Sequence, residues 1–85
     1  MKVIDDVIAQ LSENPHCGSS CFLGEALASA CNSNYKVSML DASVKLDMDS
    51  KRLLLGLMQI AQQPDYSNSD QSKALTWLRE NEYID

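Results

Sequence analysis

The side chains best suited to chemistry in this 85-residue chain are its single histidine and its three cysteines. They follow the spacing HC-x3-C-x9-C, as His16, Cys17, Cys21 and Cys31. A zinc ion needs four such ligands at one point, and zinc signatures usually pair two cysteines as C-x2-C. In one continuous helix, Cys21 and Cys31 lie about 15 Å apart along the axis at 1.5 Å per residue. We therefore predict no metal site and interpret both as small core residues.

Cys17 is also a candidate nucleophile, because a helix N-terminus lowers the pKa of a thiol and His16 is its neighbour. Adjacent side chains seldom face each other, however, and the chain has no second histidine to act as a base. The simpler interpretation is a lone imidazole in a loop, followed by a cysteine at a helix start. We expect no catalytic residue and no cofactor, and therefore no enzyme.

The segment Asp47-x-Asp49-x-Lys51 is similar to the start of a calcium-binding loop. The third acidic position of that loop is a lysine here, and the glycine that such a loop needs is missing. Capping of a helix by one of the two aspartates explains them better.

Composition limits the partners that the chain can bind. The formal net charge is −5, and Lys51-Arg52 is the only adjacent pair of basic residues. Because nonspecific nucleic-acid binding needs clustered basic groups that displace counterions, the composition argues against it. The longest apolar run, Leu53 to Met58, is too short to span a bilayer, and we expect no signal peptide. The odd number of cysteines favours reduced thiols, so we expect a cytoplasmic protein. Its length of 85 residues predicts a single domain over residues 1–85.

The segment that organises the fold is 21–32, which is apolar around most of its circumference. Only three of its residues form a polar strip, namely Glu25, Ser29 and Asn32. A helix of this kind belongs in the centre of a fold. Ser19 or Ser20 is its expected N-cap. Gly24, which is costly inside a helix, predicts that another helix crosses there at close range.

Apolar residues at three- and four-residue steps predict four further helices around the central one. Their expected ranges are 2–13, 39–45, 68–81, and a long helix that Asp47 or Asp49 caps and that ends at Gln63. Ser38, followed three residues later by Asp41, resembles a capping box for the short helix. We therefore expect an all-α fold, a compact bundle of four main helices plus one short helix around a central buried helix.

Four residues are candidates for binding a protein partner, namely Met48, Leu55, Trp77 and Tyr83. The long helix has a wide apolar arc, made of Leu53, Leu54, Leu57, Met58, Ile60 and Ala61. Leu55 lies on the opposite, polar side, with Met48 two turns earlier on the same line. Such a pair usually faces a partner helix, unless the C-terminal tail or residues 35–37 cover it. Trp77 and Tyr83 are added because tryptophan and tyrosine dominate interface hot spots.

The leading interpretation is a non-catalytic accessory protein that binds a protein, with a homodimer as the default assembly. Two alternatives remain open. Residues 39–57 can form a helix-turn-helix unit that exposes Lys51 and Arg52, as in DNA-associated regulators, although an ordinary αα-hairpin has the same pattern. The negative net charge also suits an antitoxin-like inhibitor that covers a basic surface on another protein.

Several short features along residues 18–64 match those of a known family. They are Phe22-Leu23 opening a helix, Ala30 and Asn32 near its end, Leu40 in a short helix, Leu46-Asp47 before a long helix, and the Leu57–Ile60 spacing. In these features the chain resembles a family of small uncharacterised helical proteins carried on mobile genetic elements such as plasmids, integrative elements and gene cassettes. It lacks a second aromatic residue in the central helix. The resemblance implies a helical fold and assigns no catalytic residue.

Overall fold

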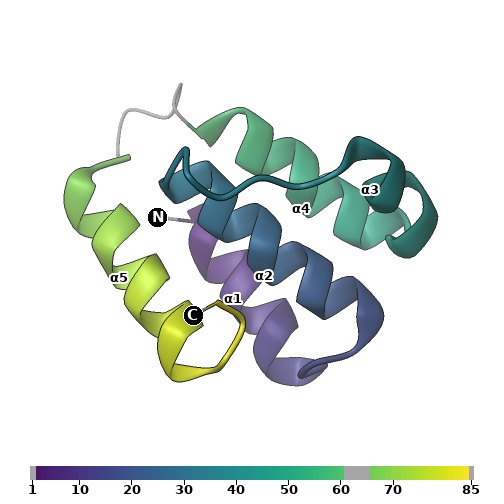
Figure 1. The fold of residues 1–85 in the computed structure, drawn as a ribbon, viewed down its shortest axis with the longest axis horizontal. Helices are drawn as coiled ribbons and strands as arrows, with labels where there is room; N and C mark the ends of the chain where they lie inside the picture. Colours follow the sequence, from purple (N-terminus) through teal and green to yellow (C-terminus); the bar gives the residue numbers. More distant parts are fainter. Residues whose placement is uncertain (1, 61–65, 85) are drawn as a thin grey trace.

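The computed structural model describes residues 2–60 and 66–84, which form five helices and no strand (Figure 1). The helices are α1 (Lys2–Glu13), α2 (Gly18–Cys31), α3 (Met39–Lys45), α4 (Met48–Met58) and α5 (Asn68–Glu80). The Cα radius of gyration is 11.6 Å, close to the roughly 12 Å of a compact chain of this length. The predicted all-α fold, with four main helices and one short helix, is confirmed.

The predicted central helix is α2, which contacts each of the other four helices. α5 and α3 lie on opposite sides of it (Figure 1). Most of α2 is buried, as the sequence predicts, but Cys21 is exposed and its interpretation as a core residue is wrong. Cys21 lies one helical turn before Glu25, on the strip that faces solvent. Cys31 is buried, as expected.

α2 begins at Gly18, three residues earlier than predicted, and Cys17 is its N-cap. The Cys17 backbone is extended, with φ −76° and ψ 168°, and its side chain makes no capping hydrogen bond. The predicted caps, Ser19 and Ser20, lie instead in the first turn of the helix. Ser20 is fully buried, and its Oγ lies 3.2 Å from the Cys17 Sγ, so this hydroxyl is directed toward the thiol rather than a backbone N–H.

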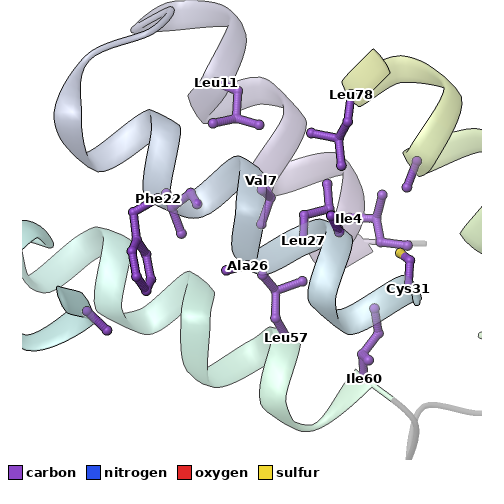
Figure 2. Close-up of a cluster of buried hydrophobic side chains, with 14 of the residues drawn as sticks. Ile4, Val7, Leu11, Phe22, Ala26, Leu27, Cys31, Leu57, Ile60 and Leu78 are labelled. Carbon is purple, nitrogen blue, oxygen red and sulfur yellow. The ribbon is translucent and has the colours of Figure 1, made fainter. Parts of the chain in front are cut away.

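The hydrophobic core lies between α2 and the inner faces of α1, α4 and α5 (Figure 2). The apolar stripe of α1 contributes three buried side chains, Ile4, Val7 and Leu11. Leu57 enters from α4 and Leu78 from α5, and both are buried against this stripe and α2. Full burial of one such side chain contributes about 1.5–3 kcal/mol, so the core supplies most of the stability that the small fold has.

Three helices begin at a residue whose side chain caps the helix. The caps are Ser38 for α3, Asp47 for α4 and Ser67 for α5. Each accepts a hydrogen bond from the backbone N–H three residues further on, at 2.8–3.3 Å. Ser38 caps α3 as predicted, although the complete capping box is formed by Ser67 and Asp70 of α5, and of the two candidates for α4 the cap is Asp47. The hydrogen bond from the backbone N–H of Ser50 also holds the pKa of Asp47 below its ordinary value.

The long helix of the prediction is shorter in the structure, since α4 ends at Met58. Its C-cap is Gln59, whose N–H donates to the carbonyl oxygens of Gly56 and Leu57. Glycine weakens a helix by about 1 kcal/mol relative to alanine, so this last turn is a natural place to stop. The predicted end at Gln63, together with Ala61 and Pro64, lies outside the described residues.

Two glycines mark close approaches between segments. A Cβ atom added at Gly56 would lie 2.8 Å from the Cγ2 of Val3, so α1 crosses α4 at close range there. A Cβ atom added at Gly24 would lie 2.7 Å from the Cδ1 of Tyr83. The helix crossing predicted at Gly24 is therefore wrong, because the C-terminal tail occupies that position instead of a helix.

Candidate interaction surface

Six large hydrophobic side chains are strongly exposed among the described residues, and all six belong to α3 and α4. They are Met39, Leu40, Val44, Met48, Leu55 and Met58, with exposed fractions between 57% and 76%. We call these six residues the α3–α4 surface. A single exposed hydrophobic residue is ordinary, but a cluster on two consecutive helices is typical of an interaction site.

α3 exposes apolar side chains because a seven-residue helix cannot turn all of them to one side. Ala42 in the helix and Leu46 at its C-cap are buried. Leu40 and Val44, four residues apart, project from a different face and are 73% and 76% exposed. We call this pair the Leu40–Val44 ridge.

The two α4 residues proposed from sequence, Met48 and Leu55, are 75% and 57% exposed. Neither the tail nor residues 35–37 cover them. Met58, which the sequence places in the buried arc, is 62% exposed, so that prediction is wrong. The buried line of α4 passes through Ser50 and Leu57, and its arc is narrower than expected because α4 packs mainly against α1 and α2.

An apolar groove separates α3 from α4. Its volume is about 260 Å³, and it is lined by Met39, Ala42, Ser43, Lys51, Leu54, Leu55 and Met58. A second cleft of about 230 Å³ shares Met39, Leu54 and Met58 with it and reaches inward to Ala26 of α2. A dry apolar cavity of about 150 Å³ can bind benzene, so each space is large enough for one apolar side chain of a partner.

The charges around the α3–α4 surface differ from those of the rest of the chain. Residues 36–52 contain four of the seven lysines and arginines and three of the twelve aspartates and glutamates. This stretch therefore has a net charge of +1, and the remainder of the chain has −6. All seven charged side chains of the stretch are exposed. Arg52 lies 3.6 Å from Asp49, so opposite charges alternate beside the apolar side chains.

The two other predicted interaction residues, Trp77 and Tyr83, lie at a different place in the fold. Their ring centroids are 5.9 Å apart and the planes differ by 14°, while the His16 ring lies 4.5 Å from Tyr83 at 10°. We call these three rings the C-terminal stack. The Tyr83 hydroxyl donates to the backbone carbonyl of Leu11 at 3.3 Å and accepts from the backbone N–H of His16 at 3.2 Å. The structure therefore uses Trp77 and Tyr83 within the chain and does not join them to Met48 and Leu55.

A turn after α5 brings Tyr83 into the C-terminal stack. Glu82 adopts a left-handed backbone conformation, with φ 64°. The Tyr83 N–H then donates to the Leu78 carbonyl and the Glu82 N–H to the Arg79 carbonyl, which is the hydrogen-bond pattern of a Schellman motif. The C-terminal tail is therefore docked against the helices.

The thiols of the chain differ in their chemistry. Cys17 is exposed, and hydrogen bonds with the hydroxyls of Ser20 and Ser19 lower its pKa from 9.0 to about 7. Burial raises the pKa of Cys31 above 9.0. Within residues 2–60 and 66–84, no three histidine, cysteine or acidic side chains come together in a way that could hold a metal ion. Among the described thiols Cys17 thus has the lowered pKa that suits a nucleophile, and the ring of its neighbour His16 stacks on Tyr83.

Comparison with models of known protein families, with curated proteins and with solved structures gave no match for this chain. None of the helices in the described part is long and apolar enough to cross a membrane.

The sequence prediction missed four of the six residues in the α3–α4 surface, namely Met39, Leu40, Val44 and Met58. One signal for the first three was present. Five of the eight residues from Met39 to Leu46 are apolar, which is more than one face of a two-turn helix can bury.

Proposed function

We propose that this protein acts by binding another protein through the α3–α4 surface and has no catalytic activity of its own. The observation that carries the proposal is the gathering of all six strongly exposed hydrophobic side chains on two consecutive helices. Large apolar side chains cost free energy when they face water, and three of the six, Met39, Leu55 and Met58, line one groove. Binding of a partner removes this cost, and the groove between α3 and α4 offers a place for an inserted side chain.

The positions of the chemically reactive side chains support the same proposal. The three cysteines and the histidine lie outside the α3–α4 surface, and Cys31 is buried in the core. The reduced thiols favour an accessory protein of the cytoplasm, consistent with the resemblance to mobile-element proteins. Both the location and the family stay proposals.

The DNA-associated alternative uses the same two helices. Lys51 and Arg52 are exposed near the start of α4, but Asp47 and Asp49 lie beside them, and Arg52 is near Asp49. These carboxylates repel phosphate, and the helix continues with the exposed Leu55 rather than with polar side chains. Duplex DNA binding that weakens steeply with salt, and that is lost when Lys51 and Arg52 are neutralised, would favour this alternative over ours.

A binding experiment with matched charge changes tests the proposal. The chain is immobilised, captured proteins are identified and purified, and their affinities are measured by titration. Leu55→Glu places a carboxylate in the α3–α4 surface, and Thr76→Glu places one on an exposed position of α5. We expect Leu55→Glu to weaken specific binding about tenfold or more and Thr76→Glu to leave it unchanged, because only the first buries an unpaired charge. Partners that bind both variants as tightly as the native chain would overturn the proposal.

A further inference from the structure

We infer that the partner of the α3–α4 surface is a second copy of this chain, which forms a two-fold symmetric dimer. The inference rests on the proposed function, because it names the partner for the same surface. It follows from three properties of that surface, namely its extent, its shape and its charge.

The extent of the surface matches that of a dimer interface. Six large side chains, each more than half exposed, offer an apolar area on the order of several hundred Å². A standard protein interface covers about 800 Å² on each partner, with an apolar centre and a polar rim. The exposed Lys45, Asp49 and Lys51 supply such a rim beside the apolar residues.

The shape of the surface is complementary to itself. α3 carries a projecting feature, the Leu40–Val44 ridge, and also forms one wall of the groove through Met39 and Ser43. In a two-fold dimer each copy presents the same patch, so the ridge of one copy can enter the groove of the other, and the reverse contact forms at the same time. The groove volume of about 260 Å³ accommodates a side chain such as Leu40 or Val44.

The charge distribution favours contact between identical copies through this face. Residues 36–52 have a net charge of +1, whereas the remainder of the chain has −6. Two copies that meet through the acidic parts of that remainder bring like charges together, which is unfavourable. Two copies that meet through α3 and α4 keep the acidic regions apart, and they can place Lys51 or Arg52 of one copy near Asp41 or Asp49 of the other.

Sedimentation velocity over a concentration series, with circular dichroism as a check of folding, tests the inference on the full chain. We expect the native protein to be a dimer that dissociates on dilution. Leu40→Glu and Leu55→Glu should each raise the dimer dissociation constant about tenfold or more, because each buries a charge in the interface. Thr76→Glu, which makes the same charge change on α5, should leave the dissociation constant unchanged.

The possible failures are distinguishable from failure of the proposed function. A native protein that stays monomeric at its highest soluble concentration overturns the dimer, and so does a series of growing oligomers, which indicates head-to-tail contacts. In either case the proposed function still stands if a different protein binds and loses affinity on Leu55→Glu. A dimer that forms equally well in all three variants overturns the inference, because another face then makes the contact.

Discussion

Outside the hydrophobic core, large apolar and aromatic side chains gather in two regions of this molecule, the C-terminal stack and the α3–α4 surface. In the stack, Tyr83 contacts the His16 and Trp77 rings, lies over Gly24 and uses its hydroxyl in two hydrogen bonds. On the α3–α4 surface, six hydrophobic side chains are exposed to solvent.

The difference arises from how many segments reach each region. The loop after α1, the helices α2 and α5, and the tail all converge at the C-terminal stack. α3, by contrast, packs mainly against α2, and one helix can cover only one of its faces. The α3–α4 surface therefore stays exposed to solvent, whereas the three rings of the stack contact one another within the chain.

Removal of one side chain from each region tests most directly how far each contributes to the stability of the fold. We expect Tyr83→Ala to lower the free energy of unfolding by about 2–3 kcal/mol, because ring packing and two hydrogen bonds are lost. At concentrations where any dimer has dissociated, Leu55→Ala should change it by less than about 0.5 kcal/mol, because an exposed side chain loses little. Urea denaturation followed by circular dichroism measures both values.

Tyr83→Phe serves as the control for the larger effect. It keeps the ring and removes the hydroxyl, so about 1 kcal/mol should be lost. Equal losses for Tyr83→Ala and Leu55→Ala would show that the tail does not hold the fold together, and the contrast between the two regions would then be wrong.

Gly24 is the point where α2 meets the C-terminal stack, so a substitution there tests how closely Tyr83 packs on the helix. We expect Gly24→Ala to destabilise the protein by about 1 kcal/mol. The added Cβ would lie 2.7–3.0 Å from three Tyr83 atoms, and this overpacking exceeds the roughly 1 kcal/mol gained in helix propensity. In the Tyr83→Ala background the same substitution should be neutral or stabilising, which is a coupling that a double-mutant cycle measures.

Gly18→Ala is the matched control for this prediction. Gly18 also belongs to α2, but nothing lies within 4 Å of a Cβ atom placed there. The control should raise the free energy of unfolding by a few tenths of a kcal/mol up to about 1 kcal/mol. If Gly24→Ala behaved like Gly18→Ala, the tail would not be packed on α2 as the structure shows.

The sequence predicts the helices well wherever a periodic pattern and a capping residue coincide. The bounds of α1 and α3 match their predicted ranges, and the caps Ser38 and Asp47 act as expected. The start of α2 is missed because Cys17 caps it through backbone conformation alone, without a side-chain hydrogen bond that a sequence pattern would reveal.

The C-terminal stack could not be predicted from the sequence for a different reason. The turn that docks Tyr83 needs a left-handed residue, which is usually glycine, and here that residue is Glu82. Nothing local therefore indicates the turn. Exposure of Met48 and Leu55 follows from helical periodicity, but exposure of Met58 depends on where α4 ends and on what packs beside it, and both are tertiary properties.

The smallest expected effect concerns the Cys17 thiol, which adjoins the C-terminal stack through His16. Its pKa of about 7 lies below the ordinary value of 9.0, chiefly because of the Ser20 hydroxyl. We expect its rate of alkylation by iodoacetamide to reach half its maximum near pH 7, and Ser20→Ala to move this midpoint upward toward 9.0. Ser43→Ala, a matched change in the α3–α4 groove, should not move it.

The lowered pKa of Cys17 also makes the free energy of unfolding depend on pH. Because the folded state lowers the thiol pKa, its contribution to the free energy of unfolding is fully present above pH 9.0 and is lost as pH falls through about 7. The difference in stability between the native chain and Ser20→Ala should therefore be larger near pH 9 than below pH 7. Cys31, whose pKa is raised by burial, contributes in the opposite sense, so the comparison needs the Ser20→Ala difference rather than the native curve alone. A Cys17 midpoint near 9.0 in both proteins would show that the Ser20 hydroxyl does not stabilise the thiolate.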